Sequence, residues 1–186
     1  DPVNYGGIGV VIGHEMSHGF DDQGSMFDKD GNMINWWTAE DKAKFNEKGD
    51  KLASQFDEVE VLPGVHANGR YTLGENIGDH GGLSIAFSAM QNALKKHPQG
   101  LVDGFTPEQR FYLSYGKIWA QNITDQEKAR LTNMDPHSLA ENRVNVSIRN
   151  FQSFFDAFDM IAFGSSKKKH SEEFRKLVAY HEAGHA

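Results

Sequence analysis

The amino-acid sequence predicts a mainly α-helical fold, α+β at most. Three observations indicate it: apolar residues recur at helical spacing in several segments, capping signals precede two of them, and two histidines stand four residues apart. The chain has 186 residues, of which 38% are hydrophobic and 11% aromatic, and this is enough for the core of one domain with a short appendage.

The first helix is predicted from its periodic residues. Residues 6–9, Gly-Gly-Ile-Gly, are expected to form a flexible entry. Gly19 is expected to end the helix, because glycine commonly follows the last turn. One face of this helix collects Val10, Val11, His14 and His18.

A threonine cap predicts the second helix. The Thr38 side chain can accept a hydrogen bond from a free backbone N–H group of the first turn. The expected inner face carries Phe45, Leu52 and Phe56. Residues 57–71 are expected to form a loop, because Pro63-Gly64 and Asn68-Gly69 are turn dipeptides.

The later helices follow from further periodic segments. One is predicted over about residues 73–94, and Thr106-Pro107-Glu108-Gln109 opens another as a capping box with proline at the first helical position. Residues 135–150 are expected to be irregular, with a strand at 143–148. A last amphipathic helix is expected from Phe151, Phe154, Phe155, Phe158, Ile161 and Ala162.

The character of the chain changes at Gly164. Residues 1–163 form the expected main body, and the polar residues 164–170 are expected to be a linker. Residues 171–186 are expected to form a separate helix, which carries a second His-Glu-x-x-His pattern at His181–His185. Two histidines alone make an incomplete zinc shell, so we expect this second pattern to bind zinc weakly at best.

Composition argues against several classes of protein. A formal net charge of −7 argues against nucleic-acid binding, and the absence of cysteine excludes disulfides and thiolate zinc sites. No apolar run is long enough to span a membrane. The sequence has neither a signal peptide nor an initial methionine, so we expect a processed product or an excised fragment. The oligomeric state stays open.

The pattern His14-Glu15-Met16-Ser17-His18 carries the chemistry. Histidines four residues apart on a helix point the same way and can bind one Zn²⁺ ion, with the intervening glutamate as general base. A third ligand from elsewhere would leave the fourth position open for water, as a catalytic zinc site requires. Glu75 is the expected third ligand.

Two carboxylates are expected to orient the ligand histidines, because a metal-bound histidine usually donates its other N–H group to an acceptor. Asp79 lies four residues after Glu75 on the same helix face, and Asp21 lies just past His18. The plain alternative is a helix whose histidines have other hydrogen-bond partners, with Glu75 and Asp79 on an exposed face.

Longer stretches of the sequence resemble the neprilysin family of zinc peptidases over about residues 1–163. The segment from Asn4 to Gly24, with Gly13-His14-Glu15 at its centre, resembles the active-site helix of that family. Further matching stretches follow in the family's order: Trp36-Trp37-Thr38, Leu73-Gly74-Glu75-Asn76-Ile77-Gly78-Asp79, Gly104-Phe105-Thr106-Pro107, Asp135-Pro136-His137-Ser138 and Arg143-Val144-Asn145.

This resemblance implies a thermolysin-like zinc peptidase lobe, here truncated, that acts on short peptides and holds one catalytic Zn²⁺. It implies that His14, His18 and Glu75 are the zinc ligands and Glu15 the base, with Asp79 and Asp21 orienting the histidines. His137 resembles the histidine that stabilises the transition state, and Arg143 the arginine that binds the substrate backbone. The family resemblance suggests an extracellular, periplasmic or cell-surface location, although cytoplasmic bacterial relatives exist.

Some family features are missing from this sequence. The substrate-binding Asn-Ala-x-Tyr segment, the second helical lobe and the Arg-Val-x-x-Trp ending are not found in it. Residues 177–186 instead resemble the zinc helix of membrane-anchored AAA-type proteases, which suggests a chimera, an artificial sequence or a truncated gene product. The alternatives to an active peptidase are therefore a catalytically silent zinc-binding fragment and a helical interaction module.

Overall fold

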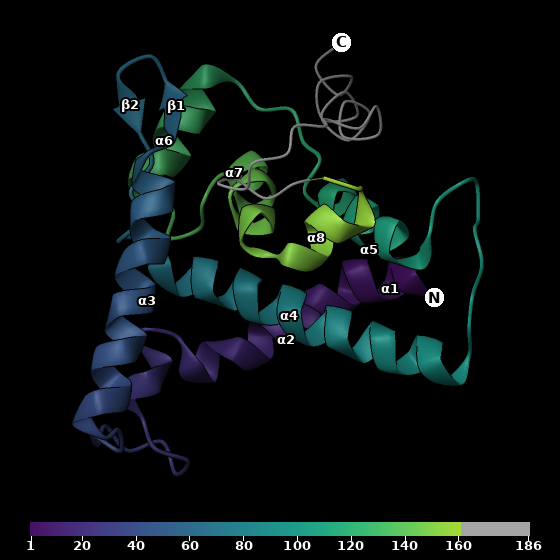
Figure 1. Ribbon diagram of the computed structural model, residues 1–186. Coiled ribbons are helices and arrows are strands. Elements are labelled where there is room, and N and C mark those ends of the chain that lie inside the picture. Colours follow the sequence, from purple (N-terminus) through teal and green to yellow (C-terminus); the bar gives the residue numbers. More distant parts are fainter. Residues whose placement is uncertain (161–186) are drawn as a thin grey trace.

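The computed structural model describes residues 1–160, and two helices that lie side by side, α2 and α4, form its centre (Figure 1). The α-helices are α1 (Pro2–Asn4), α2 (Val10–Ser17), α3 (Ala39–Asp57), α4 (Leu73–Lys96), α5 (Pro107–Ile118), α6 (Asp125–Met134), α7 (Ala140–Asn145) and α8 (Gln152–Ala157). Short 3₁₀ turns cover His18–Phe20, Gly24–Met26 and Ser147–Asn150. The predicted mainly helical fold is confirmed.

The glycine-rich entry is helical rather than flexible, so that prediction was wrong. A π-helical turn, Tyr5–Gly9, joins α1 directly to α2. A Cβ atom on Gly6 would lie 2.0 Å from the carbonyl oxygen of Phe111, so glycine here lets this turn touch the backbone of α5. The absence of a side chain at Gly6 thus allows the two backbones to approach closely. The sequence alone had indicated a flexible backbone at these glycines.

Helix α3 begins as predicted, since the Thr38 side chain accepts a hydrogen bond from the Asp41 N–H group. The segment after it is not simply a loop. A two-stranded antiparallel hairpin forms from β1 (Glu60–Leu62) and β2 (Val65–His66). The Pro63-Gly64 dipeptide makes its turn, with Gly64 at a φ of +77°, and the hairpin lies beside α6 (Figure 1).

The capping box of α5 is present as predicted, with Thr106 and Gln109 each bonding the other's backbone N–H group. Helix α6 was missed, because none of its side chains is buried and it therefore shows no apolar stripe. The strand expected at 143–148 is wrong: this segment is α7 followed by a 3₁₀ turn. Val144 and Ile148 favoured a strand by type, but their four-residue spacing buries both on one side of helical turns.

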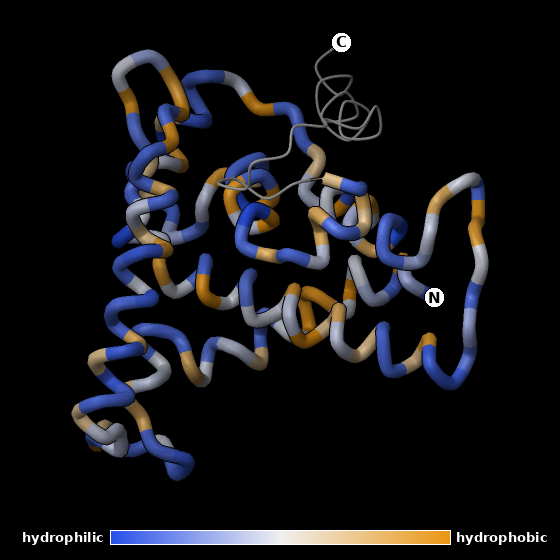
Figure 2. Tube along the Cα trace, in the orientation of Figure 1, coloured by the Kyte–Doolittle hydropathy of each residue, from blue (hydrophilic) through white to orange (hydrophobic). Residues whose placement is uncertain are grey.

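The hydrophobic core lies where α4, α5 and α8 meet. Figure 2 shows the hydrophobic colours gathered along the middle of α4, whereas α3 is mostly hydrophilic. The core residues are Val10, Leu83, Ala86, Met90, Phe111, Tyr112, Tyr115, Val144, Ile148, Phe154, Phe155 and Phe158. The last expected helix is confirmed only as α8, and its outer residues Ile161 and Ala162 lie outside the described part.

The expected linker and the second His-Glu-x-x-His pattern also lie outside the described residues. Among residues 1–160, no helix combines the length and apolar character that a membrane crossing needs.

Candidate active site

Helices α2 and α4 touch through their backbones. A Cβ atom on Gly82 would lie 2.4 Å from the carbonyl oxygen of Val10 and 2.8 Å from the backbone nitrogen of His14. A Cβ atom on Gly13 would lie 2.9 Å from the Cα atom of Gly82. Any larger side chain would hold the helices apart. This contact brings the histidines of α2 against the first turns of α4.

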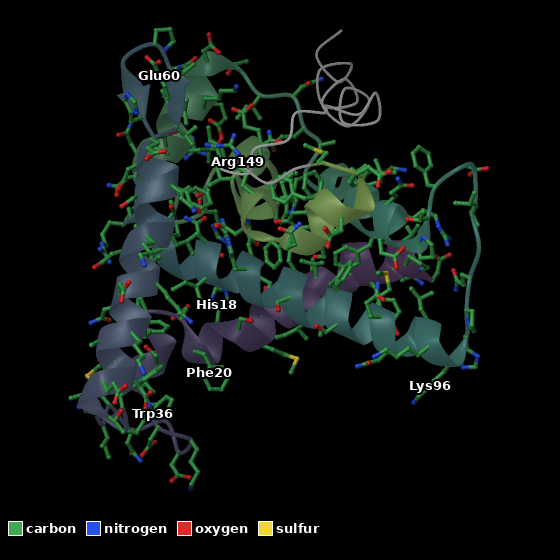
Figure 3. All side chains as sticks on the ribbon, viewed as in Figure 1. His18, Phe20, Trp36, Glu60, Lys96 and Arg149 are labelled. Atoms are coloured by element: carbon green, nitrogen blue, oxygen red, sulfur yellow. The ribbon has the colours of Figure 1, made fainter. Side chains whose placement is uncertain are left out.

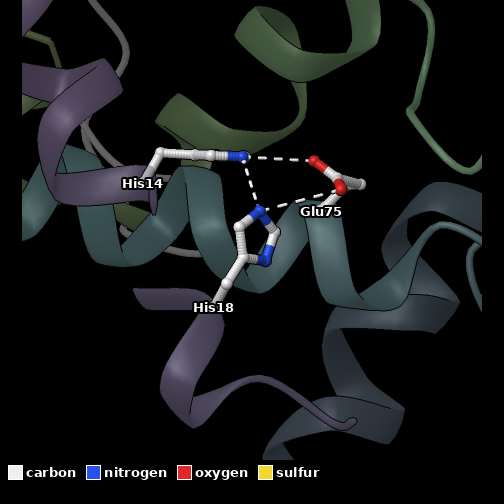
Figure 4. A group of neighbouring side chains, drawn as sticks. All are labelled: His14, His18 and Glu75. Atoms are coloured by element: carbon white, nitrogen blue, oxygen red, sulfur yellow. Dashed lines mark hydrogen bonds and ion pairs between the residues drawn. The ribbon is translucent and has the colours of Figure 1, made fainter. Parts of the chain in front are cut away.

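His14, His18 and Glu75 converge on one point (Figure 4). The Nε2 atom of His14 lies 3.0 Å from Nε2 of His18 and 3.2 Å from Oε2 of Glu75. Nε2 of His18 lies 3.7 Å from Oε1 of Glu75. Within residues 1–160, this is the group whose ligand atoms, all within 4.8 Å of one another, suit a metal ion.

Two aspartates fix the histidine rings. Nδ1 of His14 lies 2.9 Å from Oδ1 of Asp79, and Nδ1 of His18 lies 2.8 Å from Oδ2 of Asp21. An ionised carboxylate only accepts hydrogen bonds, so each Nδ1–H group donates. In the neutral imidazoles both Nε2 atoms then carry lone pairs, and these face each other across 3.0 Å.

Such an arrangement favours a positive charge between the two nitrogens. The Glu75 Oε2 atom is buried and lies 3.2 Å from Nε2 of His14, close enough to share a proton or a metal ion with that nitrogen. Two imidazole nitrogens and one carboxylate oxygen form a donor set that suits a catalytic zinc ion. The residues present therefore fit the metal.

The same contacts shift the ionisation of His14 and Asp79. Burial lowers the pKa of His14, but its hydrogen bonds with Asp79 and Glu75 raise it more, to about 9. Burial raises the pKa of the Asp79 carboxyl, but the hydrogen bonds from His14 and Arg143 and the positive charges of these two residues lower it below its usual range. Asp79 thus stays ionised at neutral pH and keeps its role as an acceptor.

Arg143 of α7 is held from three directions. Its Nε and one Nη atom donate to the two oxygens of Asp79 at 2.8 and 2.7 Å, and its side chain is buried. The guanidinium lies 3.9 Å from the centre of the Trp119 ring, a cation–π contact. The Tyr115 hydroxyl donates to the Arg143 carbonyl oxygen at 3.0 Å. One Nη atom then lies 3.9 Å from Oε2 of Glu75.

His137 reaches the same carboxylate from the loop between α6 and α7. Its Nε2 atom lies 3.1 Å from Oε2 of Glu75, and its Nδ1–H group donates to Asp135 at 2.7 Å. Its side chain is nearly half exposed, so solvent reaches this side of the site. Seven of the eight residues expected at the site therefore lie in one connected group. Glu15, the eighth, lies between the two histidines on α2 with its side chain exposed.

Sequence reasoning missed the groups that hold these side chains. Trp119, Tyr115 and Asp135 were given no role at the site. The two-residue spacing from Asp135 to His137 is a signal that could have been used, because an aspartate often accepts hydrogen bonds from the residue two positions on. Nothing in the sequence indicates the Trp119 contact, which depends on the fold.

Comparison with known proteins agrees with this geometry. The model of peptidase family M13 matches residues 1–173. Neprilysin-1 of Caenorhabditis elegans is 41% identical over 164 residues, and endothelin-converting enzyme 1 of Bos taurus is 42% identical over 159 residues. Each alignment covers 84% of this chain but only 22% and 21% of the two relatives, so the chain spans about a fifth of their length.

Solved structures show the same likeness. The Mycobacterium tuberculosis zinc metalloprotease ZMP1, solved in complex with an inhibitor, is 42% identical, with a TM-score of 0.82 over 86% of this chain and 25% of that chain. The comparisons give no support to the likeness of residues 177–186 to AAA-type proteases. The family match, the identities of about 40% and the shared fold all agree: this chain belongs to peptidase family M13, the neprilysin family.

Proposed function

We propose that this chain is the zinc-binding part of an endopeptidase that hydrolyses short peptides, with His14, His18 and Glu75 as the ligands of one zinc ion. The observation that carries the proposal is the convergence of two Nε2 atoms, whose rings are held through Nδ1 by aspartates, and a buried carboxylate oxygen of Glu75. Membership of a peptidase family supports the same reaction class. The family resemblance extends the proposal to an extracellular, periplasmic or cell-surface location.

A zinc ion held by these residues would lower the pKa of a bound water to about 7 and would polarise the peptide carbonyl. Glu15 accepts a proton from the attacking water and passes it to the leaving nitrogen. An exposed glutamate next to His14 suits this role, because the substrate must reach the same side of the helix. Asp79 and Asp21 hold the two imidazoles in the tautomer that keeps Nε2 free.

His137 and Arg143 both approach Oε2 of Glu75, at 3.1 and 3.9 Å. We propose that His137 stabilises the negative charge that develops on the carbonyl oxygen, and that Arg143 binds the substrate backbone. The ion pair with Asp79 and the contact with Trp119 fix the guanidinium before any substrate arrives, which limits the reorganisation needed during the reaction.

The test is Glu15→Gln, assayed for zinc content and for turnover of a fluorogenic peptide with and without a chelator. We expect one zinc per chain in both proteins, and a loss of turnover of roughly 100-fold or more in the variant. The matched control is Glu58→Gln, an exposed glutamate at the end of α3, which should leave both quantities unchanged. Retained turnover in Glu15→Gln would remove the assignment of the base.

A second function, zinc binding without turnover, is favoured by one observation: the chain spans about a fifth of the length of neprilysin-1 of Caenorhabditis elegans, so most of that protein has no counterpart in the alignment. The same assay separates the two functions. Stoichiometric zinc with no chelator-sensitive turnover in the unmodified chain supports the silent fragment, and no stoichiometric zinc after dialysis supports a helical interaction module.

A further inference from the structure

A buried polar triangle lies directly behind the candidate site. Its corners are Thr72 at the start of α4, Asn76 in the first turn of α4, and Ser138 in the loop before α7. The side chains are 5%, 0% and 7% exposed. The Ser138 hydroxyl lies 2.8 Å from Oδ1 of Asn76 and 3.1 Å from the Thr72 hydroxyl, and Nδ2 of Asn76 lies 2.9 Å from the Thr72 hydroxyl.

The hydrogens of this triangle have one consistent arrangement. Ser138 has a single hydroxyl hydrogen, and the shorter contact assigns it to Oδ1 of Asn76. Asn76 in turn donates to the Thr72 oxygen, and the Thr72 hydroxyl can donate to the Asn68 carbonyl at 3.1 Å. Removing any one hydroxyl or the amide would therefore leave a buried partner unsatisfied.

The triangle joins the two segments that carry Glu75 and His137. Asn76 follows Glu75 on α4, and Ser138 follows His137 in the loop, so the hydrogen bond between Asn76 and Ser138 sits one residue from the contact between His137 and Glu75. His137 has little packing of its own, because its side chain is 46% exposed. At the other end of the loop, the Tyr71 hydroxyl donates to the Met134 carbonyl oxygen.

We propose that Ser138 and Asn76 are positioning residues for the peptidase reaction, and that they act by holding the His137 imidazole at Glu75. This inference rests on the proposed function, since it assumes that His137 stabilises the reacting carbonyl oxygen. The Asp135 carboxylate sets the rotation of the ring, while the triangle sets where the loop stands relative to α4. Both are needed to bring Nε2 to 3.1 Å from Glu75.

The test is a double-mutant cycle. Ser138→Ala and His137→Ala are made singly and together, and kcat and KM are measured at full zinc loading. We expect Ser138→Ala to lower kcat roughly tenfold with little change in KM, because a displaced catalytic group costs mainly transition-state stabilisation. We expect no further loss of kcat when Ser138→Ala is added to His137→Ala.

Two further variants separate positioning from general stability. Thr72→Ser keeps the hydroxyl of the triangle and should retain the original kcat. Ser114→Ala removes another buried serine hydroxyl, which donates to the Val3 carbonyl oxygen far along the chain, and should also leave kcat unchanged. Equal losses of kcat in Ser114→Ala and Ser138→Ala, or an additive loss in the double variant, would overturn the proposal.

A measurement without substrate keeps this inference distinct from the proposed function. In ¹³C-histidine-labelled protein, the ring signal of His137 is compared between the original chain and Ser138→Ala. We expect the signal to move and broaden in the variant, while those of His66 and His97 stay in place. If the original chain shows no turnover, the proposed function fails, but an altered His137 signal still supports the positioning. An unchanged signal overturns it.

Discussion

The inner and outer sides of α2 differ in what covers them. On the inner side, the backbone of Gly13 touches α4 and the His14 ring is buried. The outer side of α2 and its flanking turns carries Ile8, Ile12, Met16 and Phe20, each more than half exposed. Figure 3 shows Phe20 pointing away from α4.

This difference indicates which part of the site the chain completes by itself. The side that holds the expected zinc ligands is packed, hydrogen-bonded and charge-balanced within residues 1–160. The side where the apolar residues lie is exposed in this chain. Metal binding should therefore depend strongly on inner-side residues, while the fold should depend little on the outer side.

The largest effect is expected from Asp79→Ala. This change removes the shared partner of His14 and Arg143 and leaves a buried guanidinium without its carboxylate. Breaking such a buried pair costs about 3–5 kcal/mol of unfolding free energy. Urea denaturation would measure this, with Asp30→Ala, at an exposed pair with Lys29, as a control that should leave the midpoint in place. Equal denaturation midpoints in the two variants would contradict the conclusion that the fold depends on the packed inner side of α2.

The next effect is a dependence on pH in the metal-free protein. The folded chain raises the pKa of His14 from 6.5 to about 9, so the folded state holds this proton more tightly than the unfolded state does. The resulting stabilisation is complete below pH 6.5 and is lost as pH rises towards 9, by about 3 kcal/mol at most. Denaturation at a series of pH values would show it, and His14→Gln should flatten the curve between these limits.

A smaller cost is expected from Gly82→Ala. The added methyl group would meet the Val10 carbonyl oxygen and push α2 away from α4. Such overpacking should lower the free energy of unfolding by about 1–3 kcal/mol. Zinc affinity should fall with it, because His14 moves relative to Glu75. Gly116→Ala is the matched control, because a Cβ atom there meets nothing within 4 Å. Since alanine favours a helix more than glycine does, the free energy of unfolding of this variant should rise by up to about 1 kcal/mol. Unchanged zinc affinity in Gly82→Ala would show that the two helices tolerate separation.

The smallest effect is expected on the outer side. Ile12→Ser removes an apolar side chain that is already more than half exposed, so the free energy of unfolding should change by less than about 0.5 kcal/mol. Denaturation and sedimentation velocity at several concentrations would check this. A loss of more than 2 kcal/mol, or a change from dimer to monomer, would mean that a second copy of the chain covers this side in solution.

The sequence predicted most of what local rules control. Thr38 and the capping box at Thr106 marked helix starts, and the four-residue spacing of the histidines implied a shared face. Residue type gave a wrong prediction of secondary structure where tertiary packing determines the local conformation. Glycines 6–9 suggested flexibility but allow contact with α5, and the valines near Arg143 suggested a strand but fill a helical turn.

The residues of the candidate site also fall into those that local spacing predicts and those that it does not. Local spacing pointed to His14, His18, Glu75, Asp79 and Asp21, because each lies a few residues from another member of the group. His137 and Arg143 came only from the family resemblance, since neither lies within a helical turn of another member of the group. No pattern in the sequence could reveal the contact of Arg143 with Trp119 or the triangle behind Ser138, because these depend on how α4, α5 and the loop before α7 meet.

The spacing of Glu75, Asn76 and Asp79 along the first turns of α4 determines which neighbours these side chains reach. Neighbouring residues on a helix point about 100° apart and residues four apart about 40° apart, so Glu75 and Asp79 both reach His14 and the Arg143 guanidinium, whereas Asn76 reaches the loop before α7. One residue inserted at 77–78 would swing Asp79 off His14 while Glu75 stayed where it is. Descendants of this gene should therefore tolerate exchanges at Ile77 far more readily than any change in the number of residues between Glu75 and Asp79.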